Sequence, residues 1–595
     1  MEKIELLVPA KNFECLKKAV ECGADCIYLG AKKFNCRAAN NQNNFTINEL
    51  IRAINYCKER NVKAYLTLNT LIKDEEFEEA INLADIAYKN GIDAIIVQDL
   101  GLGKELIKRY PKMDIHASTQ TTITNRQGIK FIEKMGFKRA IVSRELSMSQ
   151  IESICKNSNI EIETFIHGGL CISYSGQCLF SSINYGLAGN RGMCVGSCRD
   201  TFLLKQNDSI IDSGKLLKPK DLLGLEYIPK LINAGVKCLK VQGRTRSIEY
   251  IEEVTKIYRK YIDLAYSNNQ YVIAEEDIKK LESVSTRGLS TAHFGEESNK
   301  NYIVENNIKK YNEENQSKKK INYSKKLLKN ATYKNNNISI LLSNIKENYN
   351  YEKLAKSINR VYIPIKEFNN IVNEKIIDLC KRYNVYIYMP LVILEKDIEE
   401  YKKILNNILN KYRITGFVLS NYSDLSLIEE YGEKYKYISN YTFNIFNINS
   451  CNILKELQVD VVTTSIELSN EESNKISKSF KGQVERIIYG RPPLMNIKYS
   501  LVNKETISSK KVHGEYQLKD LQTDGEFEIE NNNNDSILTK IYSKKIISIG
   551  DTYKNNSLRL DFRDESIEEI NNVIEKIQNG KFYYGDLYFN DILVK

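Results

Sequence analysis

Short apolar segments alternate with helical patterns along the first half of the chain. Stretches such as INELIRAINYCKERN and DEEFEEAINLADIAYKNG repeat apolar residues every three or four positions, as a helix with one buried face does. The segments between them are short and apolar, which is typical of buried strands. This alternation predicts parallel β/α units. The predicted strands are Ile4–Val8, Cys26–Leu29, Lys63–Leu68, Ala94–Val97, Asp114–His116, Ala140–Ser143, Ile162–Ile166 and Cys238–Val241.

Eight predicted strands separated by helices match the count of a (β/α)8 barrel. A doubly wound open sheet is the competing topology, but no glycine-rich phosphate loop follows the first strand. We therefore predict an α/β fold, a (β/α)8 TIM-like barrel. Residues 199–222 are expected to form a β-hairpin insert before the eighth strand, and SIEYIEEVTKIYRKYIDLAY is expected to close the barrel as a helix.

The pattern of the first half starts again about 322 residues further on. GFKRAIVSRELS matches QVDVVTTSIELS, and CLKVQGRTRSIEYIEEV matches SLRLDFRDESIEEINNV, with the order of the matches preserved. We expect an N-terminal catalytic barrel over 1–300, a polar linker over 301–337 and a second, degenerate barrel over 338–595. Tyr489 stands in the second copy where the first has His167.

Polar side chains follow most of the predicted strands. In a (β/α)8 barrel the carboxyl ends of the strands form one mouth, where the chemistry takes place, and arginines at such a mouth can clamp carboxylates bidentately. The predicted catalytic residues are His116, His167, Arg144, Glu145 and Arg244. The predicted substrate-binding residues are Arg37, Asn69, Gln98, Ser118, Gln120, Tyr174, Gln242 and Arg287.

Four of the 13 cysteines lie close together in a glycine-rich run after the seventh predicted strand, with the spacing C-x6-C-x15-C-x3-C. Four thiolates can hold an iron–sulfur cluster or a tetrahedral zinc. Zinc knuckles prefer two to four intervening residues, which only the last pair has. Buried free thiols are the plain alternative, and disulfides need an oxidising compartment. The predicted metal ligands are Cys171, Cys178, Cys194 and Cys198; the second copy lacks all four and is expected to hold no cluster.

Charge and hydropathy add little to this picture. The net charge is +10, from 86 basic and 76 acidic residues, which favours an anionic partner only weakly. The sequence has no uncharged apolar run long enough for a transmembrane helix and no leader-like pattern at its start. We therefore expect a cytoplasmic protein that does not enter a membrane.

The first half contains seven characteristic motifs: LLVPAKNFE, CRAANNQNNF, HASTQ, SREL, ETFIHGGLCISYSGQC, NRGMCVGSCR and KVQGRTRS. Together these motifs resemble peptidase family U32, the collagenase-like proteins. The resemblance implies that the chain belongs to the branch that hydroxylates a pyrimidine of tRNA or 23S rRNA without molecular oxygen. It also implies a 4Fe–4S cluster on the four cysteines, prephenate as the oxygen donor, and structured RNA and a small dicarboxylate as partners. Gln242, in the last motif, departs from the glutamate that such a motif would carry.

Two other functions compete with RNA hydroxylation. A metallopeptidase of the zincin type has no support, because the chain has four histidines and no H-E-x-x-H motif. A Cys/His peptidase would pair a cysteine outside the cluster with His116 or His167. A non-catalytic scaffold is disfavoured, because the first half keeps its full set of polar residues.

Overall fold

The computed structural model describes most of the chain. The described residues are 3–39, 43–267, 271–295, 301–304, 337–370, 373–502, 515–532, 536–548, 557–579 and 587–588.

The chain forms two compact units that interleave in sequence. One unit comprises Met1–Lys320 with Met495–Ile541, and the other comprises Ile321–Leu494 with Tyr542–Lys595. The domain boundaries expected from the sequence stay a prediction, and residues 305–336 of the expected linker lie outside the described residues.

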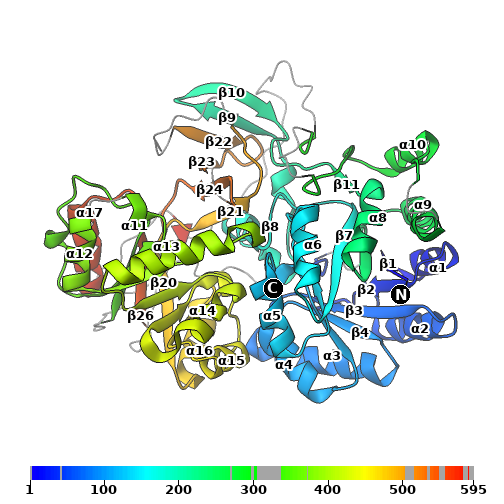
Figure 1. Cartoon of the computed structure of the whole chain (residues 1–595), viewed down its shortest axis with the longest axis horizontal. Helices are drawn as coiled ribbons and strands as arrows, with labels where there is room; N and C mark the ends of the chain where they lie inside the picture. Colours follow the sequence, from blue (N-terminus) through cyan, green and yellow to red (C-terminus); the bar gives the residue numbers. More distant parts are fainter. Residues whose placement is uncertain are drawn as a thin grey trace. The chain divides into compact units, whose positions relative to one another are not determined.

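The first unit contains the predicted (β/α)8 barrel (Figure 1). Within the described residues, eight strands pair in parallel in sequence order, and the eighth closes the barrel between the seventh and the first. The sequence prediction is therefore confirmed, with strand ends within a few residues of those expected. The strands are β1 (Glu5–Pro9), β2 (Cys26–Leu29), β3 (Lys63–Leu68), β4 (Ala94–Val97), β5 (Asp114–Ala117), β6 (Arg139–Ile141), β7 (Glu161–Gly168) and β12 (Cys238–Val241).

Helices of the first unit bury an apolar stripe, and several of them begin at a side-chain cap. Asn12, Asp99 and Asn125 each accept a hydrogen bond from the first turn of their helix, which satisfies backbone donors that would otherwise lack a partner. The expected closing helix is α9, which packs against α1 and α10. The helices are α1 (Phe13–Glu21), α2 (Ile47–Lys58), α3 (Phe77–Lys89), α4 (Leu100–Arg109), α5 (Arg126–Met135), α6 (Met148–Lys156), α7 (Phe180–Tyr185), α8 (Ile228–Ala234), α9 (Ile248–Ser267) and α10 (Glu275–Val284).

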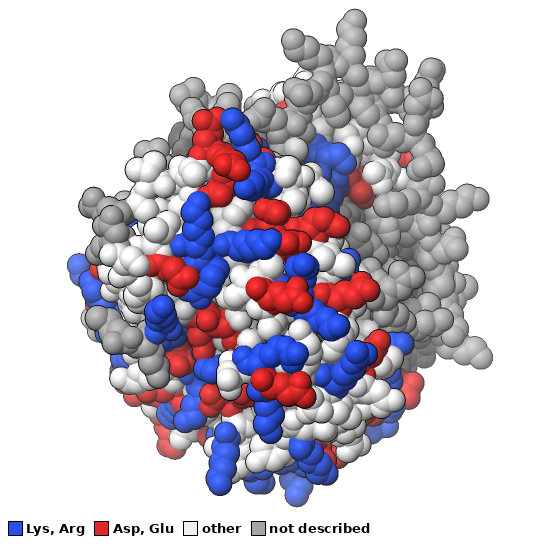
Figure 2. Space-filling model, turned by 90° about the vertical axis from the view of Figure 1, so that its right-hand side faces the viewer, with Lys and Arg blue, Asp and Glu red and all other residues white. Residues whose placement is uncertain are grey.

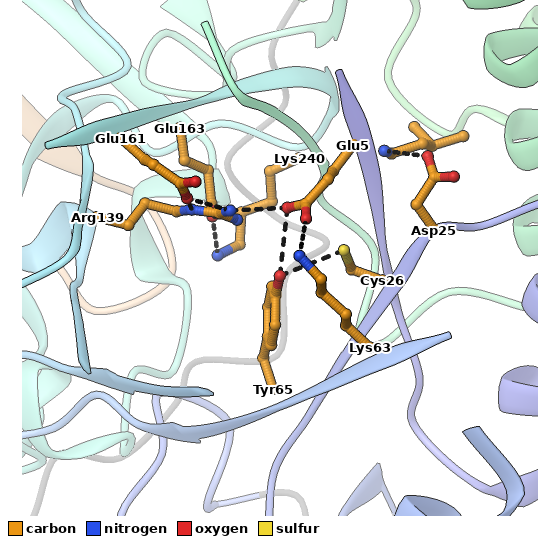
Figure 3. Close-up of polar contacts among 10 residues, drawn as sticks. Glu5, Asp25, Cys26, Lys63, Tyr65, Arg139, Glu161, Glu163 and Lys240 are labelled. Carbon is orange, nitrogen blue, oxygen red and sulfur yellow. Dashed lines mark hydrogen bonds and ion pairs between the residues drawn. The ribbon is translucent and has the colours of Figure 1, made fainter. Parts of the chain in front are cut away.

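Charged side chains cross the interior of the first barrel near the amino ends of its strands (Figure 3). Arg139 contacts Glu5 at 2.7 Å and Glu163 at 3.4 Å, and Lys240 contacts the other oxygen of Glu163 at 2.8 Å. Arg139, Glu163 and Lys240 are buried. Charges removed from water are tolerated when each is paired. The network ties β1, β6, β7 and β12 together below the mouth.

An antiparallel sheet in the first unit contains strands from both halves of the sequence. Its order is β10-β9-β22-β23-β24-β21-β8. The expected hairpin is present as β9 and β10, and its turn places Asn207 and Asp208 at φ of 46° and 68°, a left-handed conformation that these residues tolerate. The strands are β8 (Ser173–Cys178), β9 (Phe202–Gln206), β10 (Ser209–Gly214), β21 (Pro493–Ile497), β22 (Tyr516–Asp520), β23 (Glu526–Asn531) and β24 (Thr539–Ser543).

The second unit contains a second barrel with the same strand order. Eight of its described strands pair in parallel, and β19 pairs with β20 to close the barrel, so the predicted duplication is confirmed. β17 and β20 begin 322 residues after β4 and β7. The strands are β14 (Ile338–Leu342), β15 (Ile358–Pro364), β16 (Asn384–Tyr388), β17 (Gly416–Leu419), β18 (Lys436–Ser439), β19 (Val461–Thr463), β20 (Gln483–Gly490) and β26 (Ser557–Phe562). The helices are α11 (Glu367–Asn370), α12 (Asn373–Arg382), α13 (Ile398–Lys411), α14 (Ser426–Tyr431), α15 (Ile448–Glu456), α16 (Asn470–Ser479) and α17 (Ile567–Gln578).

The surface carries both signs of charge. On the face drawn in Figure 2, basic and acidic side chains alternate rather than forming one field. Helices α9 and α10 pair such charges one turn apart, as in Lys256–Glu252 and Lys280–Glu276. None of the helices in the described residues is long and apolar enough to cross a membrane.

Candidate functional site: a pocket of arginines and cysteines

A pocket of about 230 Å³ opens at the mouth of the first barrel. Its walls come from the segments that follow β2, β6, β7 and β12 and from the cysteine loop, so it lies at the carboxyl ends of the strands, as such barrels lead one to expect. The lining residues are Cys36, Arg37, Ala39, Arg144, Gly169, Leu170, Cys171, Gly192, Cys194, Val195, Gly196, Arg199, Gln242, Gly243, Thr245, Arg246 and Arg287.

Five arginines and no carboxylate line this pocket. Asp221, which lies behind the wall and is fully buried, pairs with Arg246 and, at 3.8 Å, with Arg287. Burial lowers the pKa of Arg287, and the neighbouring charge of Arg199 lowers it further. Gathering like charges is unfavourable unless anions neutralise them. The arrangement is one that a carboxylate or phosphate group could complete.

Two of the four clustered cysteines, Cys171 and Cys194, line this pocket. Cys178 is the last residue of β8, and Cys198 lies in a short 3-10 helix, Ser197–Arg199, that comes after α7. Burial raises the pKa of the Cys198 thiol to about 12, and the proximity of Cys194 and Cys171 raises it as well. The Cys178 thiol shifts the same way, first through burial and then through Cys194, Cys198 and Cys171. The loop thus brings all four thiols together.

One glycine shows how tightly this loop is wrapped. Gly192 has φ of 82°, and a Cβ at this position would lie 2.2 Å from the carbonyl oxygen of Asn35. No other residue type fits there without moving the backbone.

The chemistry of the donor set fits a four-iron cluster. A 4Fe–4S cluster takes one thiolate for each iron, and the loop supplies four thiols. Burial raises the pKa of Cys171, but Arg144 and Arg37 outweigh it and hold this pKa below its ordinary value, which favours the thiolate that binds metal. Within the described residues, no three His, Cys, Asp or Glu side chains are placed to hold a single metal ion.

The two predicted catalytic histidines are buried and do not line the pocket. The His167 ring packs on Tyr250 and Tyr258 of α9. Burial lowers the pKa of His167 to about 3, with a smaller contribution from Arg246, and its Nδ1 lies 3.1 Å from the Tyr258 hydroxyl. Burial also lowers the pKa of His116, together with the charges of Arg139 and Lys240. Both rings are therefore neutral at physiological pH.

Arg244 and Glu145 are also buried beside the pocket. Arg244 donates to Asn35 Oδ1 at 2.9 Å and to Thr67 Oγ1 at 3.3 Å, and its guanidinium packs over Gly30, where a Cβ would lie 2.5 Å from it. Burial lowers the pKa of Arg244 to about 10. Burial raises the pKa of Glu145 to about 7, although Arg144 opposes the shift.

The predicted substrate-binding residues divide into two groups. Arg37, Gln242 and Arg287 line the pocket. Five others lie outside the lining: Asn69, whose carbonyl accepts from Cys36 Sγ at 3.0 Å; Gln120, whose Nε2 donates to the same sulfur at 3.2 Å; and the buried Gln98, Ser118 and Tyr174.

Sequence reasoning missed several residues at the pocket. Arg199 and Arg246 line it, as does Cys36. Arg199 follows the last clustered cysteine directly, and Arg246 lies in the GRTR motif after the eighth strand, so their positions in the motifs could have identified them. Tyr302, expected in a polar linker, is buried and packs on His293 with ring centroids 4.7 Å apart.

The chain is similar in sequence to three proteins from other organisms. A Methanocaldococcus jannaschii protein named as an uncharacterized protease is 38% identical over 329 residues, 52% of this chain and 79% of the relative. The tRNA hydroxylation protein P1 of Bacillus subtilis is 34% identical, covering 49% of this chain and 71% of the relative. The 23S rRNA 5-hydroxycytidine C2501 synthase of Escherichia coli is 35% identical, covering 44% of this chain and 39% of the relative.

The family model described as peptidase family U32 matches residues 11–303 and 350–501. The match begins after β1, covers the other seven strands of the first barrel with the cysteine loop, and includes most strands of the second barrel. The chain therefore belongs to peptidase family U32.

Proposed function

We propose that this protein is an RNA-modifying enzyme that hydroxylates a pyrimidine of tRNA or 23S rRNA without molecular oxygen. The observation that carries the proposal is the shared pocket, in which five arginines and two of the clustered cysteines face one cavity. Relatives named for tRNA and 23S rRNA hydroxylation support the choice of substrate.

A 4Fe–4S cluster on Cys171, Cys178, Cys194 and Cys198 is the proposed cofactor, with zinc as the alternative. When bound, it supplies redox chemistry next to the pocket. The protein's part is to keep the loop folded and to favour the thiolate of Cys171 through Arg144 and Arg37.

Prephenate is the proposed oxygen donor. It carries two carboxylates, and a planar guanidinium can bind a carboxylate through two parallel hydrogen bonds. Arg37, Arg144, Arg246 and Arg287 face the cavity from different segments, so together they can hold both ends of a small dicarboxylate and fix its orientation.

Glu145, which follows the pocket-lining Arg144 in the chain, is the proposed proton-holding group near neutral pH. Its carboxyl is buried and has a pKa of about 7, which is the range that general acid–base catalysis favours. The neutral His116 and His167 do not line the pocket, so in the proposed mechanism they act on the donor only through the residues around them.

The target base must leave its stack to reach a barrel mouth, which costs a few kcal/mol. Contacts between the phosphate backbone and basic side chains offset such costs. A cytoplasmic location would suit this role and stays a prediction.

A peptidase is the second candidate, supported by the relative named as a protease. The two proposals differ in what they require of the cysteines. A hydroxylase needs the four-cysteine loop, whereas a Cys/His peptidase needs a free thiol and an accessible histidine.

The test is mass spectrometry of tRNA and rRNA nucleosides from a deletion strain. Loss of one hydroxylated pyrimidine, restored by wild type and not by Cys171→Ala, supports the proposal. An unchanged RNA profile, together with peptide cleavage that survives removal of iron, would assign the protein to the peptidases.

A further inference from the structure

A segment from the second half of the sequence packs against the cysteine loop. Residues 495–541 belong to the same compact unit as the first barrel. In this segment, β21 pairs antiparallel with β8, so that Ile497 lies opposite Ser173 and Met495 opposite Cys178. We call residues 495–541 the returning segment. Because β8 begins two residues after Cys171 and ends at Cys178, this segment holds the strand that links two of the clustered cysteines.

Lys498, the residue after β21, reaches the turn that follows β6. Its Nζ donates a hydrogen bond to the backbone carbonyl of Glu145. The preceding residue of that turn is Arg144, which lines the pocket and donates to Ser175 Oγ. The lysine therefore fixes the backbone next to Arg144, and with it the position from which the Arg144 side chain extends into the pocket.

Arg144 links the anion pocket to the cysteines. Its guanidinium lies in the pocket wall and also interacts with the Cys171 thiol. A displacement of Arg144 would therefore change the positive charge that meets an incoming carboxylate.

Other contacts anchor the returning segment independently of Lys498. The Tyr174 hydroxyl donates to the Ser536 carbonyl at 2.9 Å, and the backbone N–H of Asn496 donates to Ser173 Oγ at 3.1 Å. The rings of Tyr499 and Tyr302 lie 5.7 Å apart. Since these contacts do not involve the lysine side chain, the fold is expected to survive its replacement.

We propose that Lys498 is a positioning residue for the pocket of the first barrel and acts through Arg144. The second half of the sequence then takes part in the site, although its own barrel lacks the cysteines. The inference rests on the proposed function for the identity of the natural anion, but not for the position of Arg144.

The test measures anion binding to the full-length protein by calorimetry, with prephenate and with malonate as a simple dicarboxylate. We expect Lys498→Met to weaken the binding of both about tenfold, within the range of coupling energies between contacting residues. Lys498→Arg should restore binding to within about twofold of wild type. Lys519→Met is the matched control, because Lys519 lies in the same segment and pairs with Asp524 at 3.9 Å, and it should bind like wild type.

A double-mutant cycle separates positioning from general destabilisation. If Lys498 acts through Arg144, Lys498→Met should add nothing to the loss caused by Arg144→Gln. Additive losses, or a Lys498→Met protein that binds malonate like wild type, would overturn the inference. If Lys498→Met does not fold, Lys498→Gln takes its place in the cycle. Malonate binding without prephenate binding would count against the proposed donor alone.

Discussion

The two barrels can be compared strand by strand, because their registers match. Glu163 lies opposite Ile141 in the first barrel, and Glu485 lies opposite Thr463 in the second. On the last strand, Lys240 lies opposite Phe165, and Arg559 lies opposite Ile487. Each barrel thus keeps one buried carboxylate and one buried cation at matching positions, 2.8 Å apart in the first and 4.0 Å apart in the second.

The mouths of the two barrels differ. The second barrel has a pocket of about 340 Å³ beside the ends of β20 and β26, but Asp564, Glu565 and Glu569 line it together with Arg491 and Lys576. The first has five arginines and no carboxylate. The charged interior is therefore common to both barrels, while the arginines and cysteines are found at the mouth of the first, where we propose that the chemistry takes place.

The largest expected effect is the loss of the proposed iron–sulfur cluster, which should follow replacement of a clustered cysteine in the first barrel but not of a cysteine in the second. Cys171→Ala should abolish visible absorbance and reduce iron from about four atoms per chain in anaerobically purified protein. Cys451→Ala, in the core of the second barrel, should leave both unchanged. Absorbance spectra and metal analysis check this result. Stoichiometric zinc without visible absorbance in the wild type would contradict it.

The second prediction concerns the interior carboxylates. Glu163→Gln should lower the free energy of unfolding by about 3–5 kcal/mol, because Lys240 and Arg139 lose a buried partner. Glu485→Gln should cost less, about 1–3 kcal/mol, because Arg559 keeps Asp561 at 2.6 Å. Urea unfolding of each variant measures both values. If Glu163→Gln were fully stable but inactive, the charged interior would belong to the chemistry instead.

The third prediction compares arginines at the two mouths. Arg287→Gln should weaken prephenate binding about tenfold, since it removes one charge-assisted partner of a carboxylate. Arg491→Gln removes a cation from the second pocket and should have no effect. Calorimetry measures the prephenate affinity of both variants. Equal losses of affinity would mean that both mouths take part in binding.

The fourth prediction concerns acid stability. His167 has a pKa of about 3 in the fold, through burial and then Arg246, against about 6.5 in an unfolded chain. Between these values the unfolded chain binds the extra proton, so stability falls as the pH drops from about 6.5 towards 3, by about 1.4 kcal/mol per pH unit. His167→Gln should remove this part of the slope in urea titrations at pH 7, 6 and 5. An unchanged slope would show that His167 is protonated in the fold.

The strands could be predicted because their signal is local. Each is a short apolar segment between helical patterns, so the eight strands of the first barrel were placed nearly where the structure has them, and the duplication followed from repeated motifs. The cysteine loop could be located for the same reason.

The burial of individual side chains and the pairing of strands far apart in the sequence could not be predicted in this way. A polar residue at a strand end can face the mouth, the barrel interior or the surrounding helices, and spacing alone did not show that His116 and His167 are buried outside the pocket lining. Nor does any local pattern show that β22 pairs with β9, since their residues are more than 300 positions apart.

Because of this pairing, the first unit can be completed only late in the synthesis of the chain. At about 5–20 residues per second, the ribosome needs roughly 15–70 s after completing β9 to finish Ile541. Until then, β8 and β9 lack their partners β21 and β22, and unpaired strand edges invite pairing with other chains. The nascent chain therefore carries a cysteine loop whose flanking strands stay without these partners through much of its translation.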